Sequence, residues 1–418
     1  MKLFTHLCIA MLACLEGVYA QAVAPRTLAD FEKLAIERNP LVGEARAAVI
    51  AASGRAKQSG LYPNPVVSAV GEHISSGPII RGGEYGGSVQ QRIVTAGKLG
   101  LNRKAAEQEV AVSEEGAKAD RQRVLNAVRS LYYQALADQF RVDVRTNLSR
   151  LAQEAVRISG ELMNVGLADQ PDRLVAEVEA DRIALELSDA KEHQQKVWRQ
   201  LAATLNVPTL QPVHLDDDLE KIPRIDYDQT LARVLSESPE VHAASIEVTR
   251  AGLLLDRAKR EKIPDLMLAG GVRYNRELLE ASGPNILRAV GSEGFFEVGM
   301  ELPLFNRNQG NVAAARADAE RAKLQVERTK LSLGSRLAEV YAEYKTAIDR
   351  VDRYKQEMLP RAERAYQMYF ENFRQLAGAY SPALAAQRSL FQLQDSYADA
   401  LTAAWERSVE MQGLLLRE

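Results

Sequence analysis

The sequence encodes nearly the same half-domain twice. Pro40 and Pro239 begin matching helical segments 199 positions apart, and Pro65 and Pro264 end those segments at the same separation. The two copies therefore align without a gap from a helix start to the first strand, and after a short drift they run in parallel to the carboxyl terminus. A period this long predicts duplication of a whole half-domain, because the repeats of solenoid proteins are much shorter. We expect the two repeats to cover residues 21–216 and 217–418.

The amino terminus predicts an exported protein. Residues 1–20 contain Lys2, a mostly apolar run and a small residue at Ala20, which is the pattern of a cleaved signal peptide. The apolar run is shorter than the roughly 20 residues that a membrane-spanning helix needs. The segment before Cys14 also resembles a lipobox, so processing and lipidation at Cys14 are the alternative to cleavage after Ala20.

Composition excludes several classes of function. Both cysteines, Cys8 and Cys14, lie in the signal segment, so the mature chain is expected to have neither disulfides nor thiol chemistry. With 53 basic and 56 acidic residues, the chain lacks the excess positive charge of a nucleic-acid-binding protein. No nucleophile elbow, phosphate-binding loop or paired-histidine zinc motif occurs. We therefore expect no enzyme activity, no cofactor and no resident metal site.

Period-two alternation follows the first helices of each repeat. We expect strand pairs over residues 65–94 and 264–305, each around a loop. In the second pair, Phe296 and Val298 alternate with Glu297. One apolar and one polar face fit an ordinary half-buried sheet, and they also fit barrel strands with lipid on one side and water on the other. Four strands cannot close a barrel, so a membrane-spanning sheet would require several chains.

Long stretches with little or no proline follow each strand pair. We expect long helices over residues 98–165 and 310–377, and shorter helices over 172–206 and 383–416. At 1.5 Å per residue, a helix of about 65 residues is roughly 100 Å long, which no globular domain of this size needs. The shorter helices are expected to run antiparallel along the long ones in a coiled-coil-like column, with strands at one end and tight turns at the other.

Several motifs together resemble the TolC-type outer membrane efflux proteins. They are PNP at 63–65, QRIVTAGKLG at 91–100, NVGLAD at 164–169, LPLFNRNQGN at 302–311 and MLPRAERA at 358–365. The resemblance covers essentially the whole mature chain. Within the family, the PLFNRNQG and AGK segments are most similar to the heavy-metal branch of CzcC- and CusC-like factors.

The resemblance implies an α+β membrane protein that acts as a homotrimer. Four strands per chain would form one shared twelve-stranded β-barrel in the outer membrane of a Gram-negative-type envelope, in contact with its lipid, and the helices would continue as a periplasmic α-helical barrel. The implied function is a passive exit duct for heavy-metal cations, delivered by an inner-membrane RND-type pump through a periplasmic adaptor. A type I secretion or organic-compound efflux duct on the same fold, and a periplasmic coiled-coil scaffold, are the alternatives.

The resemblance also assigns docking residues at two helix-hairpin tips. Contact with the adaptor is expected at Val165, Gly166, Leu167, Ala168, Gly378, Ala379, Tyr380 and Ser381. The glycines equally suit ordinary helix termination in the left-handed conformation. Relatives often carry gate acids at the second tip, where this chain has Tyr380 and Ser381.

Charged residues are the remaining candidates. Asp169 and Asp172, beside the first tip, are candidates for an acidic periplasmic constriction, although Asp172 equally suits an N-terminal helix charge. In the strands, the residues expected to face the lumen are Gln90, Arg92, Glu297 and Glu301.

Overall fold

The chain forms two compact units. The structure, a computed structural model, describes residues 27–72, 83–166, 169–280, 287–375, 380–414 and 416. Unit 1 takes its described residues from 1–39, 124–224 and 342–409, and unit 2 takes them from 40–123, 225–341 and 410–418. Each unit draws on both halves of the sequence, because the two long helical stretches carry the chain from one unit into the other. The predicted repeats are therefore not the packing units.

Unit 1 is helical. It contains the second parts of α4 (Lys98–Asn164) and α8 (Gln309–Arg353), and the helices α2 (Leu28–Arg38), α5 (Gln170–Thr204), η1 (Tyr354–Met358), α9 (Leu359–Arg374) and most of α10 (Tyr380–Gln412). Helix α2 begins with a capping box, in which the Thr27 hydroxyl accepts from the Asp30 amide and the Asp30 carboxylate accepts from the Thr27 amide. Large apolar and aromatic side chains fill the core of this unit, including Phe31, Tyr132 and Trp198.

Unit 2 combines helices with the sheet. Its helices are α3 (Pro40–Ser59), α6 (Tyr227–Glu237), α7 (Pro239–Arg260) and the first parts of α4 (Lys98–Asn164) and α8 (Gln309–Arg353). Helix α7 begins as the sequence suggests, with the Ser238 hydroxyl accepting from the Glu240 amide and Pro239 in the first turn. Helix α3 lies along the start of α4, where Arg55 is 3.6 Å from Glu109.

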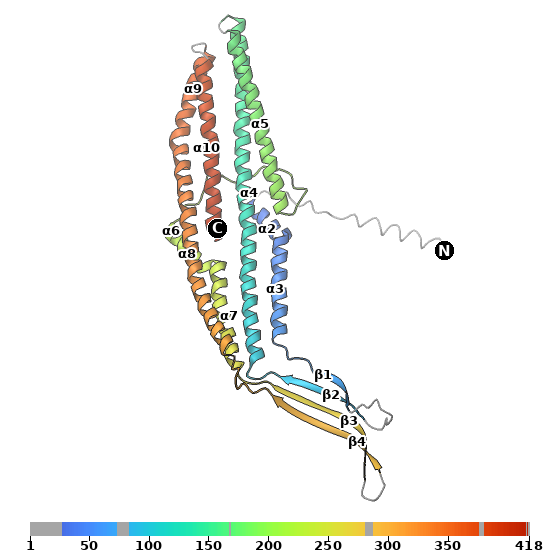
Figure 1. The fold of residues 1–418 in the computed structure, drawn as a ribbon. Coiled ribbons are helices and arrows are strands. Elements are labelled where there is room, and N and C mark those ends of the chain that lie inside the picture. Colours follow the sequence, from blue (N-terminus) through green and yellow to red (C-terminus); the bar gives the residue numbers. More distant parts are fainter. Residues whose placement is uncertain are drawn as a thin grey trace, which may run out of the picture. The chain divides into compact units, whose positions relative to one another are not determined.

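The four strands form one antiparallel sheet in the order β1–β2–β3–β4 (Figure 1). The strands are β1 (Val66–Glu72), β2 (Glu84–Ile93), β3 (Leu266–Glu280) and β4 (Leu287–Met300). The β2–β3 pairing joins the two sequence repeats. At Gly86 an added Cβ would lie 2.2 Å from the Val272 carbonyl oxygen, so this close pairing requires glycine there. Strands β1 and β4 are the two edges of the sheet within the chain.

The helix predicted over residues 310–377 is interrupted. Helix α8 passes into the π-helical turn η1 before α9 begins. Pro360 explains the change, because it has no amide hydrogen to donate to the carbonyl four residues earlier. The wider turn places a bond from the Leu359 amide to the Tyr354 carbonyl just before the proline.

The shorter helices begin earlier than the sequence predicts. Helix α5 starts at Gln170 instead of residue 172, and α10 starts at Tyr380 instead of residue 383. In both cases a proline, Pro171 or Pro382, lies inside the first turn. Proline is tolerated there because the first amides of a helix have no partner within the helix.

Candidate channel-forming surfaces

One face of the sheet is apolar and exposed. Strand pairing places Val89 beside Gly270 and Gly270 beside Phe296, in one cross-strand row of that face. Phe296 is 75% exposed. The exposed large side chains of this face are Val67, Tyr85, Val89, Val272, Tyr274, Phe296, Val298 and Met300. A continuous apolar patch of this kind marks a surface that is covered by a membrane or by another protein.

The opposite face is polar and contains three of the four residues predicted to face the lumen. Gln90, Ala269 and Glu297 form one cross-strand row, and Arg92 lies two residues along β2 on the same side. Glu301 differs, because β4 ends at Met300 and strand register no longer assigns residue 301 to a face. The sequence prediction of a strand through residue 305 is therefore too long.

An ion-pair cluster lies further along the polar face. Arg273 on β3 is 2.7 Å from a Glu84 carboxylate oxygen, 3.4 Å from Glu293 and 3.5 Å from Glu72. The Asn275 amide also donates to Glu84 at 3.1 Å. Three carboxylates surround one guanidinium, so this part of the face carries net negative charge.

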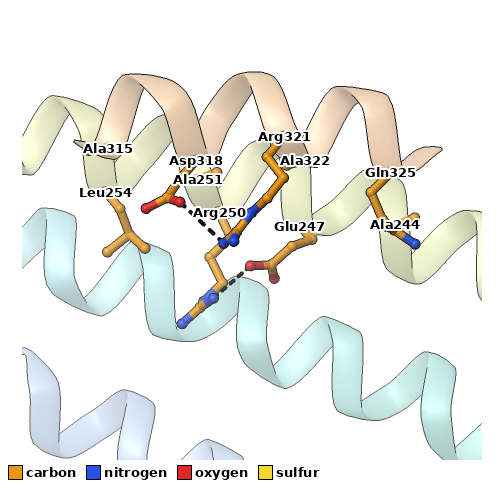
Figure 2. Close-up of a pocket in the computed structure, with 10 residues that line it drawn as sticks. All are labelled: Ala244, Glu247, Arg250, Ala251, Leu254, Ala315, Asp318, Arg321, Ala322 and Gln325. Carbon is orange, nitrogen blue, oxygen red and sulfur yellow. Dashed lines mark hydrogen bonds and ion pairs between the residues drawn. The ribbon is translucent and has the colours of Figure 1, made fainter. Parts of the chain in front are cut away.

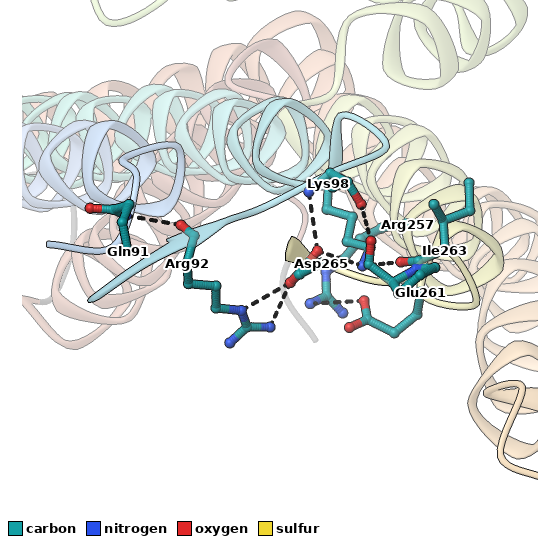
Figure 3. A network of polar contacts seen from close by, with 9 residues as sticks. Gln91, Arg92, Lys98, Arg257, Glu261, Ile263 and Asp265 are labelled. Carbon is teal, nitrogen blue, oxygen red and sulfur yellow. Dashed lines mark hydrogen bonds and ion pairs between the residues drawn. The ribbon is translucent and has the colours of Figure 1, made fainter. Parts of the chain in front are cut away.

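A second polar network joins the sheet to the helices (Figure 3). Asp265, immediately before β3, accepts hydrogen bonds from Lys98 Nζ at 2.9 Å, from the Thr95 amide at 3.1 Å and from Arg92 Nη2 at 2.7 Å. Lys98 Nζ also donates to the Ile263 carbonyl at 2.6 Å. Burial disfavours the charged form of the Asp265 carboxylate. The hydrogen bonds from Lys98, Thr95 and Arg92 outweigh this effect of burial and lower the pKa of Asp265 to about 2.

The first hairpin tip is partly described. Val165 is exposed, and Gly166 has a φ of 72° with its amide donating to the Met163 carbonyl. Gly166 therefore ends α4 in the left-handed conformation that glycine favours. The predicted tip residues Leu167, Ala168, Gly378 and Ala379 lie outside the described residues.

The acids of the first tip and the residues of the second lie at helix starts. Asp169 is the N-cap residue of α5, but its carboxylate makes no capping bond, and Asp172 is exposed in the first turn. At the second tip Ser381 is exposed, whereas Tyr380 is buried against Phe373 with ring centroids 5.1 Å apart. Burial raises the pKa of Tyr380 to about 12. Docking at this tip would therefore involve the Tyr380 side chain only indirectly.

Sequence reasoning missed the contacts of the segment between the repeats. Glu220 accepts hydrogen bonds from Lys355 Nζ and from the Tyr397 hydroxyl, both at 2.6 Å. Trp405 Nε1 donates to the Leu219 carbonyl at 2.7 Å. The Tyr344 hydroxyl donates to the Pro223 carbonyl. Additional bonds link Tyr132 to Asp217 and Gln139 to Leu215. The segment therefore contacts α4, α8, η1 and α10 inside unit 1. These contacts could not be predicted from local sequence patterns.

Two of the histidines have protein partners. His193 Nδ1 is 2.8 Å from an Asp138 carboxylate oxygen, and His242 Nε2 is 2.8 Å from the Ser236 carbonyl oxygen. Within the described ranges, no group of three or more His, Cys, Asp and Glu side chains is placed to hold a metal ion. In the part of the chain that the structure covers, no helix is sufficiently long and apolar to span a bilayer.

A groove of about 450 Å³ runs between α7 and α8 (Figure 2). Arg250 pairs with Glu247 at 2.7 Å, and Arg321 pairs with Asp318 at 3.1 Å. The remaining lining is mostly alanine, with Leu254 and Gln325. Since each charged side chain lies beside an opposite charge and most of the remaining lining is alanine, the groove does not resemble a small-molecule site.

Comparison with known proteins shows which proteins this chain is similar to. The family model described as outer membrane efflux protein matches residues 33–207 and 230–415. The chain is 24% identical over 403 residues to the cobalt-zinc-cadmium resistance protein CzcC of Cupriavidus metallidurans, covering 95% of this chain and 91% of that protein.

Solved structures share the fold. A crystal structure of CusC, described in terms of transmembrane channel formation, matches with a TM-score of 0.77 at 16% identity, covering 93% of this chain and 92% of that one. The outer membrane protein VceC from Vibrio cholerae matches with a TM-score of 0.72 at 19% identity, covering 93% and 95%. The chain therefore shares the fold of these proteins.

Proposed function

The chain belongs to the outer membrane efflux protein family, and we propose that it is the outer-membrane exit duct of a tripartite system that exports heavy-metal cations. Membership rests on a family match that covers both repeats. The protein is accordingly an outer membrane protein with a periplasmic extension. The cargo, the trimeric state and the partners are parts of the proposal.

The observation that carries the proposal is the two-faced sheet. One face exposes eight large apolar side chains, and the other carries Gln90, Arg92, Glu297 and the Arg273 cluster. In hydrocarbon every backbone amide and carbonyl needs a partner, so the free edges of β1 and β4 must pair with other strands. Three copies would supply twelve strands, pair every edge and place the polar face toward a water-filled lumen.

The duct is proposed to be passive. Energy for transport would come from an inner-membrane RND-type pump, and a periplasmic adaptor would dock at the tips formed by Val165, Gly166, Leu167, Ala168, Gly378, Ala379, Tyr380 and Ser381. Asp169 and Asp172 would then form an acidic constriction beside the first tip. Conduction requires weak binding of the cargo, so carboxylates that attract cations without a full coordination shell suit the task.

Heavy-metal cargo is supported by similarity to a cobalt-zinc-cadmium resistance protein. The charge of the polar face is compatible with that cargo, because three carboxylates surround Arg273. Rings of acidic side chains favour cations in a lumen.

Growth of a deletion strain tests the cargo. The strain would be grown across graded Zn²⁺, Co²⁺, Cd²⁺, Ni²⁺, Cu²⁺ and Ag⁺, with dyes and detergents as a parallel arm, and complemented with the wild-type gene. We expect sensitivity confined to one group of metals. Sensitivity to organic compounds alone would overturn the metal cargo and leave the duct in place.

A matched pair of variants tests the sheet. Val89 and Ser88 are adjacent on β2 and belong to opposite faces. Val89→Lys would place a charge in lipid at a cost of about 2–4 kcal/mol per chain near the bilayer midplane, whereas Ser88→Lys would place it in water. Val89→Lys is therefore expected to abolish complementation and outer-membrane assembly, and Ser88→Lys to retain both. Equal tolerance of the two variants would contradict a lipid-facing role for this face.

A further inference from the structure

The loop between β4 and α8 presents apolar side chains to the outside. Leu302 is 61% exposed, Leu304 65% and Phe305 93%. Isolated exposed leucines are ordinary on protein surfaces, but three large apolar side chains within four residues are not. They directly follow Val298 and Met300, which belong to the exposed apolar face of the sheet.

The backbone of this loop is held by hydrogen bonds. The Leu304 amide donates to the Leu302 carbonyl at 2.9 Å around Pro303. Asn308, with a φ of 61°, donates through its amide to the Asn306 side chain and through Nδ2 to the Ala258 carbonyl at 2.9 Å. The outward direction of the apolar side chains is therefore imposed by a defined loop conformation that is attached to the end of α7.

The corresponding turn of the first repeat is packed instead. There the Thr95 hydroxyl donates to the Pro264 carbonyl at 2.6 Å, and Arg260 donates to the Ala96 carbonyl at 3.0 Å. This turn joins β2 to α4 as a structural contact, whereas the loop after β4 leaves its side chains available. The difference between equivalent turns indicates a separate role for the second one.

Positive charge accompanies the apolar side chains. Arg307 is exposed in the same loop, and Lys262 is exposed in the neighbouring turn between α7 and β3, next to the exposed Ile263. Pro264 and Asp265 of that turn line a common cavity with Pro303 and Asn306, so the two segments adjoin. Aromatic and aliphatic side chains next to lysine and arginine are typical of the interface between a bilayer and water.

We propose that the segment Leu302–Arg307 is a membrane-interface anchor. Leu302, Leu304 and Phe305 insert among the lipids of the periplasmic leaflet, and Arg307 and Lys262 contact the phosphates of the headgroups. The inference rests on the proposed function, because it takes the adjoining apolar face as the lipid contact of a barrel. Since hydrogen bonds hold the loop to the end of α7, one anchor on each copy would fix how deeply the barrel sits in the membrane.

Site-directed spin labelling tests the anchor on the full chain. Both native cysteines precede residue 21, so neither processing route leaves a free thiol in the mature chain. Nitroxide labels would be attached to Phe305→Cys, to Val298→Cys on the apolar sheet face, and to Leu331→Cys. Leu331 is the matched control, because it is 75% exposed on α8, away from the sheet. Substitution of Phe305 disturbs little packing, since its side chain is almost fully exposed.

The readout is collision of each label with oxygen, which concentrates in lipid, and with a water-soluble nickel chelate. The protein would be reconstituted into vesicles of phosphatidylethanolamine and phosphatidylglycerol. We expect the oxygen-to-nickel collision ratio to be highest at 298, lowest at 331 and intermediate at 305. An equal ratio at 305 and 331, with 298 still high, would overturn the anchor and assign the loop to water or to a neighbouring copy. A low ratio at 298 as well would overturn the proposed function itself.

Discussion

The two units bury their apolar side chains differently. Among the described residues, every buried aromatic side chain belongs to unit 1, where Phe31, Tyr132 and Trp198 pack together. The apolar side chains that the helices of unit 2 bury are alanines and other non-aromatic residues, such as Ala52 on α3 and Leu333 on α8, while its sheet and loops expose their large apolar side chains. Unit 1 thus completes its core within one chain. Unit 2 leaves apolar surface for its surroundings to cover, which fits a segment that meets lipid and other copies.

Removing a large aromatic core side chain of unit 1 should have the largest effect. Trp198→Ala creates a cavity beside Phe31 and is expected to destabilise unit 1 by about 4 kcal/mol. Thermal unfolding followed by circular dichroism measures the change. The control is Phe305→Ala in unit 2, expected to shift stability by less than about 0.5 kcal/mol because the side chain is exposed. Similar losses for the two variants would show that the two units do not differ in this way.

Unit 2 should also depend on its buried ion pair. Asp265→Asn leaves the Lys98 ammonium, whose side chain is 5% exposed, without its carboxylate. We expect a loss of roughly 3 kcal/mol, the usual cost of breaking a buried pair. Asp256→Asn is the matched control, because its pair with Lys259 is exposed and contributes about 0–1 kcal/mol. Protease sensitivity of the junction between sheet and helices would measure the effect of both variants. Equal sensitivity of the two variants would argue against a structural role for the Asp265 pair.

The same carboxylate predicts a pH dependence. Its pKa is about 2 in the folded chain and 3.8 in the reference state, so the folded state favours the charged form. The resulting stabilisation, about 2 kcal/mol, is complete above pH 3.8 and is lost as the pH falls through 2. Unfolding temperatures of wild-type protein and Asp265→Asn should therefore converge in acid. If the difference in unfolding temperature stayed constant from neutral pH into acid, the charge of Asp265 would not be the cause of the stabilisation.

The smallest effect is expected at the segment between the repeats. Glu220→Gln removes the charge that pairs with Lys355 but keeps an oxygen for the Tyr397 hydroxyl. Because both partners of the ion pair are partly exposed, we expect a loss below about 1 kcal/mol. Amide hydrogen exchange in residues 215–224 should rise in this variant. Glu357→Gln, at an exposed pair with Arg361, is the control and should leave that exchange unchanged.

Much of the fold could be predicted from local patterns. Alternation across residues 296–298 predicts a two-faced strand, and the structure places Phe296 and Glu297 on opposite faces. The left-handed helix end at Gly166 follows from glycine's freedom at positive φ. The errors have local causes too. Helices α5 and α10 begin earlier than predicted because their first turns tolerate a proline. A π-helical turn precedes Pro360, where an uninterrupted helix was predicted.

The candidate site was less predictable, because its contacts join distant residues. Glu220 was not singled out, since an acidic residue in a loop carries no signal of the tyrosine that it binds 177 positions away. Glu301 was assigned to a strand because alternation continues past the last paired residue, Met300. Docking at Val165 and the acidic constriction at Asp169 and Asp172 stay predictions.

The duplication, the helix and strand types and the two faces of the strands could all be predicted from residue patterns. Each of these depends on the spacing of residue types along the chain, which is a local property. The buried pair of Lys98 in the first repeat with Asp265 in the second, 167 positions apart, depends on how the chain folds. The same is true of the packed turn after β2 and of the loop after β4, which exposes Phe305. Equivalent sequence positions met different neighbours, and burial and hydrogen bonding depend on those neighbours.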